Sequence, residues 1–522
     1  MALVCLFQFL TISSFAQQNL PWYEMVMQED LDYYEIEQAY KEQTANLSGE
    51  ALEAHQKHYY RWKRRVIGYV NPDGSIVSAD ERSKVFRNQI AHKRAVKGNW
   101  KEIGPFTAKD VYRGVGRVNC IEFHPTDSNV VYVGAPYGGV WRTIDHGKTW
   151  ENLTDHLPSF GVSAIALDPK NPNIIYVGTG DGETGRNPGF GVWKSEDAGL
   201  NWVPSNTGMG NRIVNEILIF DDNSDELLAA TNVGYFRTLN GGESWILVST
   251  GNFRDIRFKP DDQNVVYAAT TGQFFVSIDR GRSIQRKETP KAPAPRLCLA
   301  TSAAEPEAVY LVSHEVIFKS VDTGNTITVI HDEDGNRDLG GQSWYNSCAD
   351  ASPNQANVIY QGHVPTYVTY NDGETWTGMR GVHSDVHYMR HSPITGRLWL
   401  AGDGGIMSLG DDGKTFRDHT DLGVSEIYEM SQHPFQLDHL LNGYQDCGSK
   451  YYTGNRWVSR VGADGMDCIF DPDSPDIYFT TIQYGDIRRH IGGPDGKVNN
   501  FPDPQGSGEN ERGPWVSPIW VD

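Results

Sequence analysis

A short pattern, Ser/Thr-x-Asp/Asn-x-Gly-x-x-Trp, recurs along the chain and constrains its fold more than any other feature. The glycines of seven successive copies lie 52, 43, 39, 43, 49 and 40 residues apart. A period of this length is typical of similar structural units packed side by side, so we expect one repeat body rather than several unrelated domains. Four copies are complete: Thr143-Asp145-Gly147-Trp150, Ser195-Asp197-Gly199-Trp202, Thr238-Asn240-Gly242-Trp245 and Thr369-Asn371-Gly373-Trp376. Three are degraded: Ser277-Asp279-Gly281-Ile284, Ser320-Asp322-Gly324-Ile327 and Asp411-Gly413-Phe416.

Each residue type in this pattern has a structural role in a turn between two strands. The Asp or Asn side chain accepts hydrogen bonds from backbone N–H groups, glycine allows a positive φ, and the aromatic ring packs at the start of the next strand. We therefore predict that these aspartates stabilise turns and take no part in catalysis.

The clearest repeat unit runs from Val118 to Leu153. It contains four short strand patterns separated by turn signals, which is the composition of one β-propeller blade. Two later units, at Leu440–Gly443 and Asp476–Phe479, lack a good turn pattern but keep the second-strand signature. The sequence thus predicts an all-β protein with nine or more four-stranded blades, in one propeller or in two tandem propellers.

The two ends of the chain differ from this repeat. Residues 1–17 predict a signal peptide, because an apolar run is followed by small residues at 13–16. Residues 18–97 predict a linker or pro-segment with two helices broken near residues 46–49. Residues 98–522 form the propeller region, and 515–521 resemble the first strand of a tenth blade. We expect the protein to continue beyond Asp522.

Charge and cysteine content narrow the function. The net charge of −21 disfavours nucleic acid and anionic membranes as partners. Removal of the signal peptide leaves five scattered cysteines, which do not suggest a disulfide framework. Cys120, Cys348 and Cys468 have similar sequence contexts, so we interpret them as small buried residues at one repeated strand position.

The repeated pattern is the Asp-box, also called the bacterial neuraminidase (BNR) repeat. From Trp100 to Asp522 the chain resembles the large sortilin/VPS10-like Asp-box propellers, and among them secreted proteins of bacteria that use type IX secretion. The segment Val382–Gly485 carries the most specific part of this resemblance. The resemblance implies a secreted or cell-surface protein that binds a ligand.

The chain also resembles the xyloglucanase-type glycoside hydrolases, which have tandem Asp-box propellers. In that family a catalytic aspartate precedes a Gly-Gly pair, whereas Pro136 stands at the first-blade position of this chain. The surviving analogue is Asp403, in Gly402-Asp403-Gly404-Gly405. The hypothesis of glycoside hydrolysis therefore takes Asp403 and Asp446 as the carboxylate pair.

Four aspartates outside the boxes are candidates for a ligand site at the propeller funnel. A glycosidase needs two carboxylates about 5 to 9.5 Å apart, and loops that converge on the propeller axis could supply them. The same residues also fit simple caps of tight turns, which is the interpretation that we favour. The four are Asp385, Asp403, Asp446 and Asp464.

The segment His383-Ser384-Asp385-Val386-His387 is the densest local cluster. Strand alternation would place His383, Asp385 and His387 on one face, where they form either a polar ladder or part of a metal site. No distant Cys/His pair has a spacing that completes a metal shell, although His391 and His433 are available. We expect no cofactor, with Ca²⁺ at the glycine-rich loop 178–189 as the alternative.

The sequence as a whole favours a secreted, non-catalytic propeller that binds a glycan or a protein. The alternative is a glycoside hydrolase of xyloglucanase type. The sequence leaves the ligand and the oligomeric state open.

Overall fold

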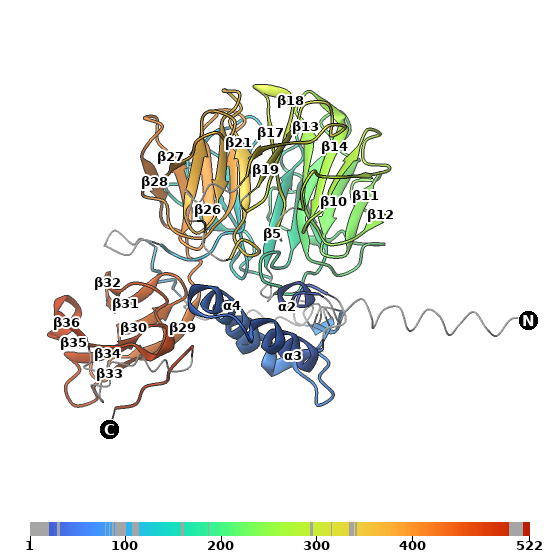
Figure 1. Ribbon diagram of the computed structural model, residues 1–522. Helices are drawn as coiled ribbons and strands as arrows, with labels where there is room; N and C mark the ends of the chain where they lie inside the picture. Colours follow the sequence, from blue (N-terminus) through green and yellow to red (C-terminus); the bar gives the residue numbers. More distant parts are fainter. Residues whose placement is uncertain are drawn as a thin grey trace, which may run out of the picture.

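The computed structural model describes residues 20–28, 32–78, 80–82, 84–85, 88, 101–106, 114–157, 161–185, 187–292, 296–314, 316–332, 339, 342–500 and 515–521. They form nine four-stranded antiparallel sheets in which sequential strands pair (Figure 1). The predicted all-β fold with nine four-stranded blades is therefore confirmed, together with a short helical N-terminal segment.

The first seven sheets form a closed ring, called the propeller below. The first strand of each blade contacts the first strand of the next, and β25 contacts β1 to close the circle. The blades consist of β1 (Cys120–Phe123), β2 (Val131–Ala135), β3 (Gly139–Thr143) and β4 (Glu151–Asn152); β5 (Val162–Leu167), β6 (Ile175–Thr179), β7 (Val192–Ser195) and β8 (Val203–Pro204); β9 (Val214–Ile219), β10 (Leu227–Thr231), β11 (Gly234–Thr238) and β12 (Ile246–Thr250); β13 (Phe253–Lys259), β14 (Asp262–Thr270), β15 (Phe274–Ser277) and β16 (Gln285–Lys287); β17 (Cys298–Ser302), β18 (Glu305–Val312), β19 (Ile317–Ser320) and β20 (Thr328–His331); β21 (Cys348–Ala351), β22 (Ile359–Gly362), β23 (Thr366–Thr369) and β24 (Thr377–Gly378); and β25 (Val386–His391), β26 (Leu398–Gly402), β27 (Gly405–Leu409) and β28 (Phe416–His419).

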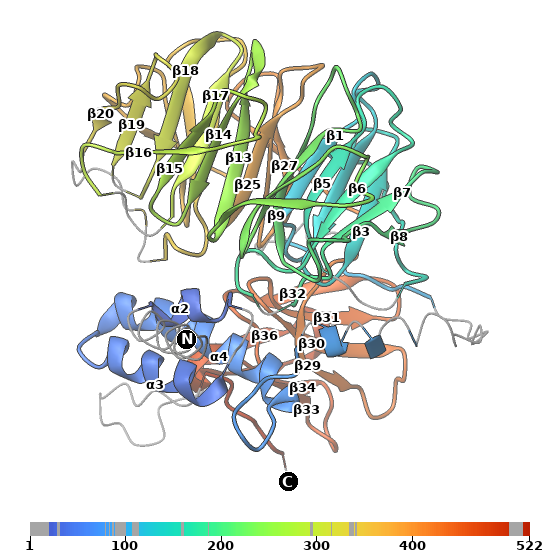
Figure 2. The same ribbon diagram turned by 90° about the vertical axis from the view of Figure 1, so that its right-hand side faces the viewer.

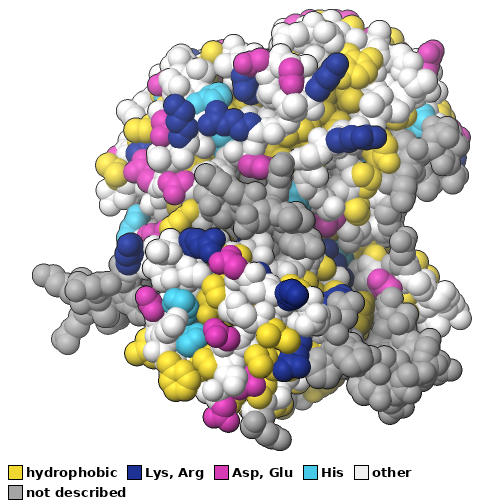
Figure 3. All heavy atoms as spheres, turned by 90° about the vertical axis from the view of Figure 1, so that its left-hand side faces the viewer, with side chains coloured by type: hydrophobic (Ala, Val, Ile, Leu, Met, Phe, Trp, Pro, Cys, Tyr) yellow, Lys and Arg dark blue, Asp and Glu magenta, His cyan; other side chains and the backbone are white. Residues whose placement is uncertain are grey.

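The last two sheets form a separate body below the propeller, called the two-blade unit (Figure 2). Their first strands, β29 and β33, contact each other. Apolar side chains are exposed on this unit, among them Met430 at 61% and Phe435 at 71%, and yellow side chains are visible on the lower body in Figure 3. Its strands are β29 (Ile427–Gln432), β30 (His439–Tyr444), β31 (Gly448–Thr453), β32 (Trp457–Val461), β33 (Cys468–Phe470), β34 (Ile477–Thr481), β35 (Ile487–Ile491) and β36 (Lys497–Asn500), with short 3-10 helices η2 (Gln483–Gly485) and η3 (Gly493–Asp495).

The Asp-boxes form the predicted turns between third and fourth strands. The carboxylate of Asp145 accepts hydrogen bonds from the backbone N–H groups of Lys148 (3.0 Å) and Thr149 (2.9 Å). Burial alone would raise the pKa of this carboxyl, but the hydrogen bonds from Thr149 outweigh burial and hold the pKa well below its usual range. The indole of Trp202 donates to the carbonyl of Leu153 in the preceding blade (3.2 Å), so a box also joins two blades.

The degraded box of the seventh blade differs from the prediction. Asp412, not Asp411, accepts the backbone hydrogen bonds of the turn, from Lys414 and Thr415. The complete boxes have a Ser or Thr hydroxyl that binds the turn glycine, whereas Leu409 occupies this position and has no hydroxyl. The turn therefore shifts by one residue.

The buried cysteines lie where the repeat predicts them. Cys120, Cys298, Cys348 and Cys468 each open the first strand of a blade. All four thiols are free and buried. The interpretation of these residues as small packing residues at one repeated position is thus confirmed for the three that the sequence singled out.

The N-terminal segment forms helices α2 (Trp22–Met25), α3 (Tyr33–Thr44) and α4 (Gly49–Val66), with η1 (Ile67–Tyr69) after them. They lie below the propeller beside the two-blade unit (Figure 1). The break between α3 and α4 covers residues 45–48 and overlaps the predicted segment 46–49. The helices share a core of aromatic and apolar side chains, to which the propeller contributes Ile213, Trp344 and Tyr345.

Two further predictions concern the ends of the chain, a tenth blade at residues 515–521 and a signal peptide at residues 1–17. Residues 515–521 form no strand, so the predicted first strand of a tenth blade is wrong; Trp515 instead packs against Tyr484 with a ring distance of 5.2 Å. The predicted signal peptide lies outside the described residues. Among the residues that the structure does describe, no helix is both long and apolar enough to span a bilayer.

Candidate functional site

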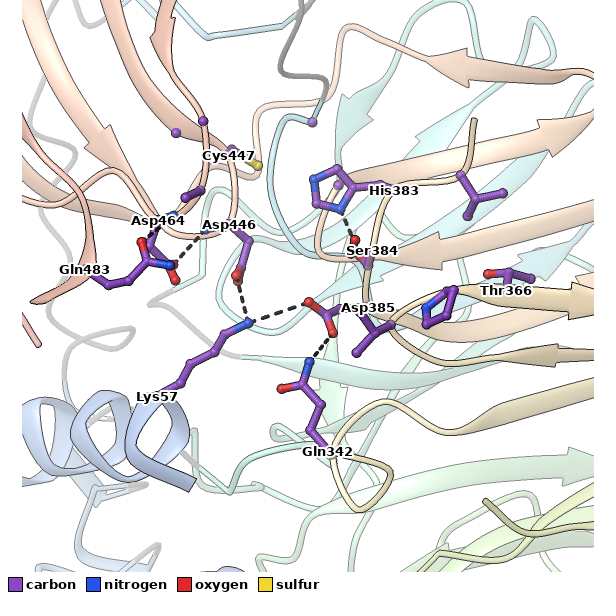
Figure 4. A pocket seen from close by; sticks show the side chains of 18 of the residues that line it. Lys57, Gln342, Thr366, His383, Ser384, Asp385, Asp446, Cys447, Asp464 and Gln483 are labelled. Atoms are coloured by element: carbon purple, nitrogen blue, oxygen red, sulfur yellow. Dashed lines mark hydrogen bonds and ion pairs between the residues drawn. The ribbon is translucent and has the colours of Figure 1, made fainter. Parts of the chain in front are cut away.

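A cavity of about 900 Å³ lies where the propeller, the two-blade unit and helix α4 meet (Figure 4). The propeller supplies Asp385 and His383, the two-blade unit supplies Asp446 and Asp464, and α4 supplies Lys57. No Asp-box residue lines the cavity among the described residues. The site therefore lies at the boundary between two bodies, whereas the sequence predicted the axis of one propeller.

The four candidate aspartates occupy two kinds of position in the last three blades. Asp403 and Asp446 both lie in the turn between the second and third strands of their blades, and Asp385 and Asp464 each precede a first strand. Single oxygens of Asp385, Asp403 and Asp446 lie within 4.8 Å of one another. Asp464 joins this group because it accepts a hydrogen bond from the backbone N–H of Asp446 (3.0 Å). The fold thus brings all four aspartates together, while their role in binding or catalysis stays a prediction.

Helix α4 inserts two cations among these carboxylates. The ammonium of Lys57 lies 3.0 Å from Asp446 and 3.5 Å from Asp385. The guanidinium of Arg61 contacts Asp446 at 2.9 Å and also pairs with Asp464. Figure 4 shows Lys57 reaching from the helix to the space between Asp385 and Asp446. The lysine thus supplies the positive charge that a metal ion would supply in such a cluster.

These contacts set the protonation of the aspartates. Burial raises the pKa of Asp385, and the neighbouring Asp403 and Asp446 add to the effect, which Lys57 only partly offsets. Burial also raises the pKa of Asp464. For Asp446 the two nearby cations outweigh burial, so its pKa lies well below the usual range. The pKa values of Asp385 and Asp446, which face each other across Lys57, are therefore shifted in opposite directions.

Asp403 occupies a different place from the one that the catalytic prediction requires. It is 1% exposed and does not line the cavity. Its carboxylate accepts a hydrogen bond from the hydroxyl of Tyr345 (3.0 Å) and lies 2.8 Å from Nε2 of His387. Asp385, assigned only to ligand binding from the sequence, faces the cavity instead and forms the pair with Asp446 across Lys57.

The predicted alternation of His383, Asp385 and His387 on one strand face is wrong. β25 begins only at Val386, and Asp385 has φ 64°, a left-handed conformation that ends the extended backbone. His383 lies at the cavity and His387 lies behind it against Asp403. The three side chains therefore cannot hold a common metal ion as a ladder.

The loop before the sixth blade holds the carboxylate of Asp385 and was missed from the sequence. Gln342 and Asn346 donate hydrogen bonds to Asp385 at 2.6 and 2.5 Å. His58 of α4 contacts the side chain of Gln342 at 3.1 Å. No local motif marks this loop, because its partners lie elsewhere in the chain: Asp385 lies about 40 positions later and His58 lies 284 positions earlier.

Backbone strain gathers around the cavity. Most non-glycine residues with positive φ lie in the turns of the repeats, as expected. Four others line the cavity: Asp385 (φ 64°), Asp446 (φ 56°), Ala463 (φ 63°) and Tyr484 (φ 66°). Each such conformation costs about 1–3 kcal/mol, and strain of this kind is common at functional sites.

Acidic residues of the glycine-rich loop 178–189 form ion pairs with arginines of other parts of the propeller region. Its Asp181 pairs with buried Arg117 at 2.8 Å, and its Glu183 pairs with Arg296. Both carboxylates thus already have cationic partners. The Ca²⁺ alternative for this loop remains without support from these contacts.

Comparisons with known proteins agree with the propeller fold. No protein-family profile matches the chain. A xyloglucanase of Acetivibrio thermocellus is 30% identical over 152 residues, and one of Paenibacillus is 30% identical over 164 residues. These matches cover 26% and 28% of this chain but only 18% and 16% of the relatives, so the chain matches less than a fifth of their length.

Solved structures give the same result at the level of the fold. An ancestral GH74 enzyme superposes with a TM-score of 0.55 at 15% identity, over 76% of this chain and 63% of the other. The GH74 xyloglucanase of Xanthomonas campestris superposes with a TM-score of 0.52 at 14% identity, over 74% of each chain. These neighbours fit the resemblance to xyloglucanase-type propellers and not the resemblance to sortilin/VPS10-like proteins.

Proposed function

We propose that the cavity binds an oligosaccharide and that the chain is a glycoside hydrolase of xyloglucanase type. The observation that carries this proposal is the pair Asp385 and Asp446, which come from separate bodies and face one cavity. The similarity to xyloglucanases supports the same ligand class. A secreted or cell-surface location is part of the proposal, since such a glycan lies outside cells.

The two carboxylates have the chemical properties that glycoside hydrolysis needs. Asp385, whose pKa is raised by burial, would donate a proton to the oxygen of the departing sugar. Asp446, held ionised by its cations, would serve as the opposing carboxylate. Gln342 and Asn346 would hold Asp385 in position throughout. Lys57 must leave the space between the two carboxylates before a glycosidic bond can enter it.

A non-catalytic glycan-binding protein is the second candidate. It is favoured by the ion pairs of Lys57 and Arg61, which neutralise Asp385, Asp446 and Asp464 in this structure. A site that stays closed in this way would bind a ligand along the outer cavity without cleaving it.

Incubation with xyloglucan oligosaccharides separates the candidates. If the chain is a hydrolase, Asp446→Asn and Asp385→Asn should each lower the rate of cleavage by about 10²–10⁴, the usual contribution of acid–base groups. Asp145→Asn, a change in an Asp-box far from the cavity, is the matched control and should leave the rate unchanged. Binding without cleavage would support the second candidate, and the absence of both would refute both.

A further inference from the structure

The surface that α4 presents to the site is a basic stripe, defined by Lys57, Arg61, Arg64 and Arg65. Because these residues lie four, seven and eight positions after the first, they share one helix face. Each pairs with an acidic residue of the propeller or the two-blade unit. The partners are Asp385 and Asp446 for Lys57, Asp446 and Asp464 for Arg61, Glu429 for Arg64, and Glu426 for Arg65.

The opposite face of α4 belongs to the helical segment itself. Tyr59 stacks on Tyr40 of α3 at a ring distance of 3.7 Å, and Trp62 stacks on Tyr33 at 5.8 Å. The helix thus has its apolar anchor in its own segment and at Trp344 of the propeller. Its contact with the acidic wall of the cavity is made by charged groups.

This charged contact is incompletely satisfied. Within the described part of the chain, Nη1 of Arg61 and Oδ2 of Asp446 have no hydrogen-bond partner, although both atoms are buried. Glu426 lies 3.8 Å from Arg65 and 3.9 Å from Arg117, which is too far for a hydrogen bond to either. Buried polar atoms without partners cost free energy, so the contact is weaker than its number of charges suggests.

We propose that the acidic wall formed by Asp385, Asp446, Asp464, Glu426 and Glu429 is a docking surface for a basic helix. Its occupant is α4 of the same chain, and the docking is reversible. When α4 is docked, Lys57 fills the space between Asp385 and Asp446. When α4 moves away from the acidic wall, both carboxylates open to the cavity. The competition between α4 and a glycan rests on the proposed function, whereas the docking itself does not.

Hydrogen exchange of the full chain tests the docking. The variant Lys57→Met with Arg61→Met removes the central cations, and Asp446→Asn with Asp464→Asn removes their partners without leaving carboxylates unpaired. In both we expect backbone amides of α4 to exchange about tenfold faster or more, while the strands of the propeller keep their protection. Lys63→Met removes the same charge from the same helix but affects contacts within the helical segment, namely the pair with Glu37 of α3 and the approach of the ammonium to the rings of Tyr33 and Tyr59. Because none of these contacts reaches the acidic wall, α4 should exchange within about twofold of the wild type.

Two outcomes would overturn the proposal. If α4 stays fully protected in both double variants, the charges do not hold it. If the propeller strands lose protection together with α4, the helix is an integral part of the fold and not a detachable occupant. A separate measurement of xyloglucan oligosaccharide binding tests the competition: the Lys57→Met, Arg61→Met variant should bind at least about tenfold more tightly than Lys63→Met. If α4 detaches and no variant binds the oligosaccharide, the docking stands and the proposed function fails.

Discussion

The propeller and the two-blade unit are built from the same four-stranded blade but are held in place by different forces. In the propeller every residue of β5 is buried, whereas no residue of β29 in the two-blade unit is buried. Apolar clusters of up to 14 buried residues join blades of the propeller, and the corresponding cluster of the two-blade unit has five. Ring closure therefore gives each propeller blade two apolar neighbours, an advantage that the two described blades of the unit lack.

The two-blade unit depends instead on charge. Its Asp446, Asp464 and Glu429 meet the basic stripe of α4, and its buried Lys450 donates to the carbonyl of Gly114 (3.1 Å), in the segment that leads into the first blade. Charged contacts are more easily exchanged with water than a packed core is. The site at the boundary is therefore the part of the molecule whose geometry responds most to substitution, salt and pH.

Removing the central charge of the boundary should give the largest effect. Arg61 is 1% exposed and holds Asp446 and Asp464. Arg61→Met would leave these carboxylates buried with Lys57 as their remaining close cation, so we expect a loss of about 3–5 kcal/mol in the unfolding free energy of the two-blade unit. Urea unfolding followed by hydrogen exchange would resolve the unit from the propeller. If the propeller and the two-blade unit lost stability equally, the two-blade unit would not depend on these charges more than the propeller does.

The second prediction concerns the propeller axis, where charge is enclosed by a ring of blades. Glu216 is 4% exposed, and burial raises its pKa to about 7, an effect that Arg390 and Arg257 only partly offset. Because the pKa in the folded state lies above the unfolded value near 4.5, its contribution to stability is complete below pH 4.5 and is lost as the pH rises through 7. The loss amounts to about 3 kcal/mol.

The variant Glu216→Gln should remove this pH dependence from the propeller. Thermal unfolding between pH 4.5 and 8 is the measurement, and Glu196→Gln, at an exposed surface position, is the control. A variant whose stability changes with pH in parallel with the wild type would show that Glu216 is not the titrating group.

These comparisons also explain what the sequence could predict. The nine blades and the seven box turns repeat with one period, and four buried cysteines share one position in it. Repetition of the same local pattern is what made these features predictable. Asp385, Asp403, Asp446 and Asp464 were found because acidic residues beside glycines stand out between boxes. The sequence predicted these four aspartates at the axis of one propeller, whereas they meet at the boundary between the propeller and the two-blade unit. A repeat pattern does not indicate after which blade the ring closes.

The cations of the site were missed for a different reason. Lys57 and Arg61 lie in a segment that resembles a linker, and their partners lie more than 300 residues away. The spacing of 57, 61, 64 and 65 on one helix face was a usable signal for an acidic partner surface. It could not identify which of the 67 acidic residues of the chain form that surface.

An intermediate loss of stability is expected from a substitution in an Asp-box, because the box makes its contacts within the propeller. Asp145→Ala removes the hydrogen bonds to Lys148 and Thr149 and should cost about 1–3 kcal/mol. Oligosaccharide binding, if present, should be unchanged, because the box does not line the cavity. Calorimetric unfolding gives the first value and titration with ligand the second. Loss of binding without loss of stability would refute the structural role of the box.

The smallest effect should come from an exposed pair on the same helix face as Arg61. Arg64 and Glu429 are 46% and 43% exposed, so water and salt screen their attraction. A double-mutant cycle of Arg64→Ala and Glu429→Ala should give a coupling of about 0.2–1 kcal/mol at low salt, which fades in 1 M NaCl. The Arg61 contact is buried and should keep most of its effect under the same conditions. If salt weakens both pairs equally, water and ions reach the Arg61 contact in solution despite its burial in this structure. The boundary would then be held by solvent-exposed charges, and the contrast with the packed propeller would lie in solvent access and not in buried charge.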